Sequence, residues 1–175
     1  MHLARGPPDP DATSVEGVAA LAYRDRVDLA QRFRPLLGSW TGVEEQAAAP
    51  RGRATSARAA LTFKLDLAGT AVVQDYRQVR ADGAELLGHG VFLAGPADGS
   101  VLWWFFDSDA QPPVPAPGRW GSSGLTLTRT GPWGTARHRF TAGPGRLGYT
   151  IEVGAGPGAT MSPFLSGRYR QVSCH

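Results

Sequence analysis

The chain has 175 residues, of which 42% are hydrophobic and 19% charged, and its formal net charge is +3. This length and composition indicate one globular domain and exclude an intrinsically disordered chain. Acidic and basic residues are interleaved without a basic block, so the charge pattern argues against a nucleic-acid-binding protein.

The cysteine content and the N-terminus indicate which cellular compartment to expect for the protein. Cys174 is the only cysteine, which excludes an internal disulfide and a cysteine-based zinc site. Residues 1–11 lack the apolar core of a signal peptide, and no stretch approaches the roughly 18 apolar residues of a membrane-spanning helix. We therefore expect a cytoplasmic protein that does not enter a membrane.

The first part of the chain predicts a loose tail followed by short helices. Residues 1–12 are rich in proline and polar residues and form the expected tail, and residues 13–175 form the expected single domain. Thr13 followed by Glu16 is typical of a capping box at the start of a helix. Pro35 cannot continue a helix, because it lacks a backbone N–H and clashes with the preceding turn. The predicted helices therefore end shortly before this proline.

From residue 39 onward the sequence alternates short apolar stretches with turn signals such as Ala81-Asp82-Gly83 and Gly143-Pro144-Gly145. A meander this long closes on itself or splits into two sheets, and closure removes the exposed edges. The predicted fold is all-β, a closed antiparallel up-and-down barrel of about ten strands with a short N-terminal helical segment. The candidate strands are Ser39–Gln46, Thr55–Lys64, Thr70–Arg80, Glu85–Ala94, Ser100–Asp107, Arg119–Gly121, Leu125–Thr130, Ala136–Thr141, Gly145–Val153 and Phe164–Val172.

The stretch Val101–Phe106 is apolar on both faces of its predicted strand. One face would fill the barrel interior. The other face needs cover, and we expect the N-terminal helix to supply it.

Three segments carry a resemblance to a known superfamily. The chain resembles the calycin barrels, which include lipocalins, fatty-acid-binding proteins and nitrobindins, and is most similar to uncharacterised bacterial barrels with a G-x-W-x-G opening. The resemblance covers roughly residues 31–172 and implies a barrel with an interior for a ligand. The segments are Leu37-Gly38-Ser39-Trp40-Thr41-Gly42, Gly88-His89-Gly90-Val91-Phe92 leading into Trp103-Trp104-Phe105-Phe106-Asp107, and Ser166-Gly167-Arg168-Tyr169-Arg170.

The resemblance also implies a structural signature at one end of the barrel. In calycins the tryptophan of the opening motif plugs one end, and an arginine of the last strand lies across its ring. Here Trp40, two residues after Gly38, would be the plug, and Arg168 or Arg170 would form the cation–π pair.

The chain departs from each named family at its binding site. Residues 47–53 are too short for the helical lid of fatty-acid-binding proteins, and the order Arg168-Tyr169-Arg170 places arginine and tyrosine on opposite faces. Residues 154–174 contain no histidine that could hold haem as in nitrobindins. We therefore expect no cofactor and no metal.

The candidate ligand-binding residues lie on three predicted strands. Gln74, Tyr76 and Gln78 share one strand face and carry polar groups beside an aromatic ring, which is typical of a ligand-filled interior. An error of one residue in register would turn all three to solvent. His89 stands between two glycines that leave room beside it. Trp103 or Trp104 would form an apolar wall.

The sequence contains no catalytic motif, so the function we favour is non-catalytic binding of a small, largely apolar molecule inside the barrel. One alternative is a small barrel enzyme of the isomerase or hydrolase type, with His89 as its acid–base group. Another is a packed barrel that acts only through protein contacts, and a homodimer stays open in either case. A cavity of roughly 300 Å³ or more would favour binding or catalysis, and a filled interior would favour the packed barrel.

Overall fold

The computed structural model describes residues 29–48, 54–109, 112–132, 134–156 and 158–172. The expected tail, most of the expected helical segment and Cys174 lie outside these described residues. Within the described part, no helix is long and apolar enough to cross a membrane.

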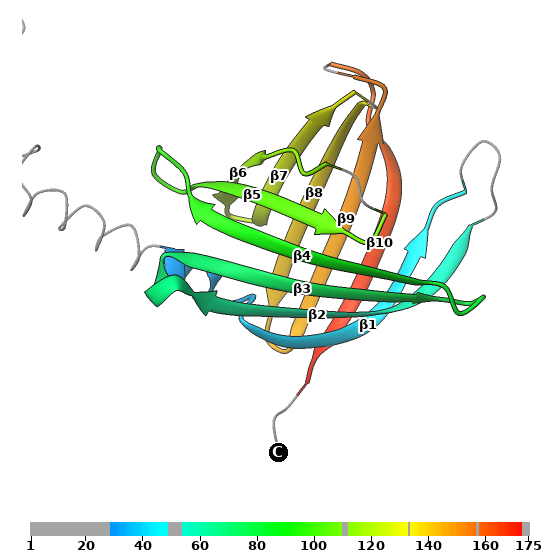
Figure 1. The fold of residues 1–175 in the computed structure, drawn as a ribbon, viewed down its shortest axis with the longest axis horizontal. Helices are drawn as coiled ribbons and strands as arrows, with labels where there is room; N and C mark the ends of the chain where they lie inside the picture. The colour runs from blue at the N-terminus through cyan, green and yellow to red at the C-terminus, as the bar shows by residue number, and fades with distance from the viewer. Residues whose placement is uncertain (1–28, 49–53, 110–111, 133, 157, 173–175) are drawn as a thin grey trace, which may run out of the picture.

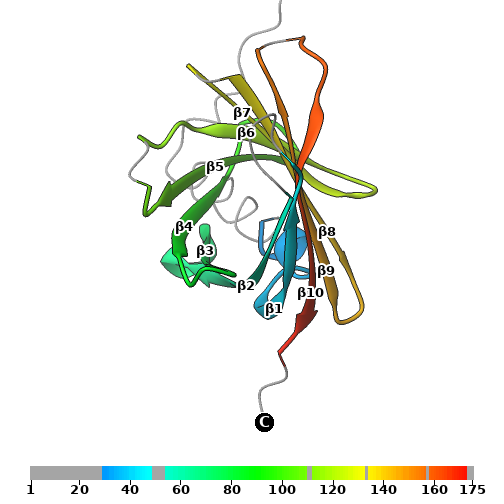
Figure 2. The ribbon, with the colours of Figure 1, turned by 90° about the vertical axis from the view of Figure 1, so that its right-hand side faces the viewer.

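Ten strands form one closed antiparallel barrel, so the predicted fold class is confirmed (Figures 1 and 2). Each strand pairs with its neighbours in the sequence, and the barrel closes where β1 pairs with β10. A helical turn at residues 29–33 precedes β1. The strands are β1 (Gly38–Gln46), β2 (Thr55–Asp66), β3 (Ala71–Arg80), β4 (Glu85–Ala94), β5 (Ser100–Asp107), β6 (Ala116–Gly121), β7 (Gly124–Gly131), β8 (Gly134–Gly143), β9 (Arg146–Gly154) and β10 (Ser162–Gln171), and a short 3₁₀ turn, η2 (Leu67–Gly69), joins β2 to β3.

Alternation along each strand separates an inner face from an outer face. On β10, Leu165 and Tyr169 are buried, whereas Ser166, Arg168 and Arg170 are exposed. Successive side chains of a strand point to opposite faces, so the first set fills the barrel and the second set faces solvent. This period of two determines which of the predicted site residues reach the interior.

One end of the barrel is closed by an aromatic plug. Phe33 of the helical turn is fully buried, and its ring centroid lies 5.0 Å from that of Phe92 and 5.2 Å from that of Trp120. Trp40 is buried beside it at the start of β1, and its indole Nε1 donates a hydrogen bond of 2.7 Å to the carbonyl of Leu36. The plug therefore joins the helical turn to the barrel wall through apolar contact and one buried hydrogen bond.

The predicted cation–π pair on Trp40 is wrong. Trp40 points into the barrel, whereas Arg168 and Arg170 are exposed on the outer face of β10. Arg170 lies opposite Thr41, the neighbour of Trp40, so the barrel wall separates both guanidinium groups from the indole. The Trp40 ring packs in the core and is hydrogen-bonded to Leu36, whereas both arginines face solvent.

Gly42 explains why the opening motif contains a second glycine. A Cβ atom at this position would lie 2.1 Å from the carbonyl oxygen of Arg168 on β10. The two strands therefore approach more closely here than any side chain allows. Gly42 permits the close pairing of β1 with β10 that shuts the barrel.

Replacing Trp40 with alanine tests the plug. Emptying a large buried aromatic site costs about 3–5 kcal/mol of unfolding free energy. Trp104→Ala, which removes a half-buried indole from the outer face, is the matched control and should cost less than half as much. Chemical denaturation measures both, and equal losses would show that Trp40 does not anchor this end.

Candidate functional site

A chamber of about 240 Å³ opens inside the barrel at the end opposite the plug. The strands run the length of the barrel, so Gln46 at the end of β1 lies far from Trp40 near its start. The wall combines apolar residues (Leu86, Phe105, Ile151, Phe164 and Leu165), neutral polar residues (Gln46, Gln74, Tyr76, Gln78, His138 and Tyr149) and charged residues (Arg80, Asp107, Asp109 and Arg129).

Strand β3 supplies three of the neutral polar side chains. Gln74, Tyr76 and Gln78 are 1%, 8% and 5% exposed, so all three face the interior, as the sequence predicted. Each lines the chamber. That they contact a ligand stays a prediction.

The expectation that His89 faces the interior is wrong. Its ring lies on the outer face, where Nδ1 is 2.9 Å from Oδ1 of Asp75 and about half of the side chain is exposed. The hydrogen bond from His89 is the main cause that lowers the pKa of Asp75 below its usual value. Lys64 lies 3.4 Å from the same carboxylate, so the three residues form an exposed charged group. His89 cannot serve the chamber.

The glycines beside His89 face inward in its place. A Cβ atom at Gly88 would lie 2.2 Å from the ring of Phe105, and one at Gly90 would lie 2.6 Å from Trp103 Nε1. The glycines thus leave room for two aromatic rings inside the barrel. The sequence signal of free space was real, but the rings of β5 fill it.

The two candidate tryptophans lie on opposite faces of β5. Trp103 is 1% exposed and packs inside, with its ring centroid 4.9 Å from that of His138 and 5.6 Å from that of Phe92. Trp104 lies opposite Val91 on the outer face and is half-buried, so its expected place in the cavity wall is wrong. Trp103 backs the chamber through its contacts with His138 and Phe105.

A buried carboxylate that the sequence analysis missed organises the polar side of the interior. Glu44 is 1% exposed. Its Oε2 accepts hydrogen bonds from Tyr76 Oη at 2.7 Å and from Gln78 Nε2 at 2.5 Å. Its Oε1 accepts a hydrogen bond from the hydroxyl of Tyr169. The Glu44 network therefore ties β1 to β3 and β10, and satisfies a carboxylate that burial would otherwise make costly.

A signal for Glu44 existed in the sequence. Trp40 and Glu44 are four residues apart on one strand, so a plugging Trp40 places Glu44 on the same inner face. Composition alone gives no reason to bury a carboxylate, and its three donors come from strands distant in sequence.

The tyrosines of the interior stay protonated hydrogen-bond donors. Burial raises the pKa of Tyr76 and of Tyr169 above the usual value, and the neighbouring Glu44 carboxylate raises both further. Burial also raises the pKa of Tyr149. The hydroxyl groups therefore remain available to donate at physiological pH.

His138 is a neutral imidazole inside the barrel. Its Nδ1 lies 2.8 Å from the hydroxyl oxygen of Tyr149. Burial lowers the pKa of His138 to about 3, and the charge of Arg129 acts in the same direction. One ring nitrogen of a neutral imidazole donates and the other accepts, so Nε2 offers a ligand one or the other.

Three buried polar atoms cluster without a hydrogen-bond partner among the described residues. They are Gln74 Oε1, Trp103 Nε1 and His138 Nε2, and a fourth unpartnered atom, Trp120 Nε1, lies apart from them in the plug. The rings of Trp103 and His138 touch, and Gln74 Oε1 and Trp103 Nε1 both adjoin Gly90. Each unpaired buried group costs about 1–3 kcal/mol. The cluster is suited to a molecule that brings its own donor and acceptor.

No group of three or more metal-ligating side chains lies close enough to hold a metal ion in the part of the chain that the structure describes. The charged residues at the chamber carry both signs, namely Arg80 and Arg129 with Asp107 and Asp109. The chamber therefore combines apolar walls, neutral donors and acceptors, and charged residues of both signs.

Comparison with known proteins shows the fold alone. No protein-family model matches the chain, and no curated protein has a matching sequence. The S-type phycobiliprotein lyase CPES from Guillardia theta superposes with a TM-score of 0.65 at 8% identity, over 87% of this chain and 97% of that chain. At this identity, the likeness supports the barrel and leaves its function to the residues.

Two further solved barrels resemble the chain more distantly. A de novo designed fluorescence-activating β-barrel has a TM-score of 0.43 at 14% identity, over 83% of this chain and 98% of its own. The protein EF1p2_mFAP2b bound to DFHBI has a TM-score of 0.45 at 12% identity, over 82% of this chain and 99% of its own.

Glu44→Gln should destabilise the protein by about 1–3 kcal/mol, because an amide NH₂ replaces one acceptor oxygen and meets a hydroxyl or amide donor. Glu45→Gln, the exposed neighbour on the outer face, is the control and should change stability by less than about 0.5 kcal/mol. Urea denaturation separates the two. An unchanged Glu44→Gln protein would mean that the interior does not require the carboxylate.

His138 should make the protein less stable in acid. Its pKa is about 3 in the folded state and 6.5 in the reference state, so between these values the unfolded chain binds a proton that the folded chain does not. This contribution to stability is complete above pH 6.5 and falls as the pH is lowered, by about 2 kcal/mol at pH 5.

Denaturation of the wild type and of His138→Gln at pH 7.5 and pH 5 measures this contribution. Between pH 7.5 and pH 5, the wild type should lose more stability than His138→Gln. His89→Gln, which changes a histidine on the outer face, should lose as much stability as the wild type. Ring NMR signals of His138 that titrate with a midpoint above about pH 5 would contradict the prediction.

Proposed function

We propose that the barrel binds, without chemical change, a compact and largely apolar molecule in the chamber. The observation that carries this proposal is the chamber itself, which has about 240 Å³ of space and borders the unpaired Gln74 and His138. Apolar walls would hold the body of the ligand, and the unpaired atoms would fix its orientation.

The volume limits the size of the ligand. Pockets for drug-sized molecules span roughly 300–1,000 Å³, and the chamber lies just below that range. A cavity of roughly 150 Å³ is enough for benzene. The chamber therefore suits a molecule of one or two rings and is too small for a long lipid chain.

The unpaired atoms limit the chemistry of the ligand. Gln74 Oε1 is an acceptor, so a ligand that reaches it needs an N–H or O–H group. The neutral His138 adds one further hydrogen bond without adding charge. A neutral ring compound with a donor group fits both requirements.

The structure argues more strongly against the barrel enzyme than against the packed barrel. An enzyme that uses His89 as acid and base loses its named residue, because His89 lies outside the barrel. The chamber, at about 240 Å³, falls below the roughly 300 Å³ expected for binding or catalysis, but it is also not the filled interior expected of a packed barrel. The ten-stranded barrel supports the resemblance to calycins, whereas membership of that superfamily, the cytoplasmic location and the absence of nucleic-acid partners and cofactors stay predictions.

Titration with phenol and toluene tests the proposal, because the two molecules share a shape and differ in one hydroxyl group. We expect both to bind and phenol to bind between about twofold and tenfold more tightly, the value of one net hydrogen bond. Gln74→Leu should remove most of that preference. Chemical shifts of the Trp103 indole N–H report the binding.

Filling the chamber with a larger side chain, as in Leu86→Trp, tests whether the ligands bind there. Leu86 lines the chamber and its neighbour Leu87 is 50% exposed on the outer face, so the same substitution fills the chamber at one position and not at the other. Leu86→Trp should weaken both ligands at least about tenfold, and Leu87→Trp should leave them unchanged. Equal behaviour of two folded variants would place binding outside the chamber.

A further inference from the structure

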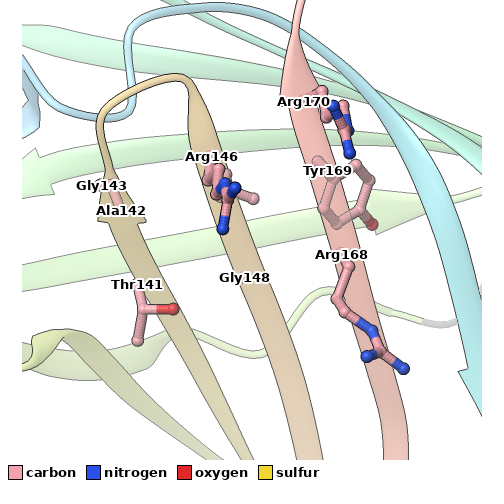
Figure 3. Close-up of a pocket in the computed structure, with 9 residues that line it drawn as sticks. Thr141, Ala142, Gly143, Arg146, Gly148, Arg168, Tyr169 and Arg170 are labelled. Carbon is pink, nitrogen blue, oxygen red and sulfur yellow. The ribbon is translucent and has the colours of Figure 1, made fainter.

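We propose a second binding site on the outer wall of the barrel, an arginine groove on β8, β9 and β10 that takes a phosphate-type oxyanion. Arg146, Arg168 and Arg170 line a shallow groove of about 560 Å³ together with Thr141 and Gly148 (Figure 3). The barrel wall separates it from the chamber, so the two sites stand or fall independently.

Strand register brings the arginines together. Arg170 on β10 lies directly opposite Arg146 on β9, and Arg168 lies opposite Gly148. Directly opposed residues of an antiparallel pair have Cβ atoms about 4.5–5.5 Å apart. Alternation turns all three arginines to the same outer face, as their exposure shows.

The positive charge in the groove is only partly balanced. Arg168 lies 3.5 Å from Glu45. Arg146 and Arg170 have no ion pair among the described residues, although like charges directly opposite each other destabilise a sheet. Three guanidinium groups and one carboxylate leave two positive charges, which matches the charge of a phosphate group near neutral pH.

The shape of the groove gives an anion access to these charges. Gly148 has no side chain between Arg168 and the neighbouring strand β8. The Thr141 hydroxyl oxygen lies 2.6 Å from the position that a Cβ atom of Gly148 would occupy, so it adds a donor beside the gap. Planar guanidinium groups donate two parallel hydrogen bonds to phosphate oxygens, which selects this chemistry over a simple halide.

Titration with inorganic phosphate tests the groove, with sodium chloride at matched ionic strength as the reference. We expect the Nε–H NMR signals of Arg146 and Arg170 to shift with phosphate and not with chloride. Arg146→Gln/Arg170→Gln should weaken binding at least about tenfold. Arg34→Gln/Arg119→Gln removes the same charge from exposed positions outside the groove and should bind as the wild type does.

A variant that keeps every charge completes the test. Gly148→Val puts a branched side chain into the gap and should weaken phosphate binding, while a thermal melt confirms that the barrel is folded. Equal shifts with phosphate and chloride, or equal losses in the two double variants, would overturn the proposal, because either result would indicate diffuse attraction without a site.

Sedimentation with lipid vesicles distinguishes the two possible sources of the oxyanion, a lipid headgroup and a soluble phosphate compound. Sedimentation with phosphatidic acid vesicles, but not with phosphatidylcholine vesicles, and release by inorganic phosphate would assign the groove to a lipid headgroup. Phosphate binding without sedimentation would assign it to a soluble phosphate compound. Sedimentation that persists in Arg146→Gln/Arg170→Gln would count against the groove.

Discussion

The buried carboxylate of Glu44 is the interaction on which the interior depends. It lies on β1, at the seam where the first and last strands close the barrel, and receives donors from β10 and from β3. A buried carboxylate without these donors would cost more than the surrounding contacts return. The hydrogen bonds therefore position Tyr76, Gln78 and Tyr169, of which Tyr76 and Gln78 belong to the polar wall of the chamber.

The plug end of the barrel contributes mainly to stability, and the opposite end is suited to binding. Aromatic rings and Leu36 fill the plug end, where burial of apolar surface stabilises the fold. The other end carries the unpaired Gln74 and His138, which weaken the fold by themselves. A well-packed plug lets the barrel tolerate this cost, and a ligand that pairs those atoms would recover part of it.

The fold and one strand face could be predicted from the sequence, since both follow from local patterns. Turn residues mark each hairpin, and the alternation on β3 orients Gln74 and Tyr76 correctly. His89 was misplaced because its flanking glycines were interpreted as space around the histidine, whereas alternation turns the glycines themselves inward. Its strand offered little else to fix the parity, since apolar residues occupy both of its faces.

Pairings between distant strands were not accessible from the sequence. Trp40 and Arg168 each suggested an interaction, but the wall that separates them is defined only once β1 lies against β10. The same closure creates the Glu44 network and the opposition of Arg146 to Arg170. The local pattern thus indicates which face a residue occupies, and the three-dimensional register decides which residues meet there.

The seam between β1 and β10 also brings the first and last strands of the chain side by side. The backbone N–H of Val172 donates a hydrogen bond of 2.8 Å to the carbonyl of Ser39, so the start of the first strand and the residue after the last strand are neighbours in space. A linker from Val172 to the helical turn that begins at residue 29 could therefore connect the last strand to the segment before the first, and the chain could begin instead at the exposed turn between β3 and β4. Such a circular permutant would keep every strand pairing, which means that the order of the strands around the ring, and not the point at which the chain starts, defines this barrel.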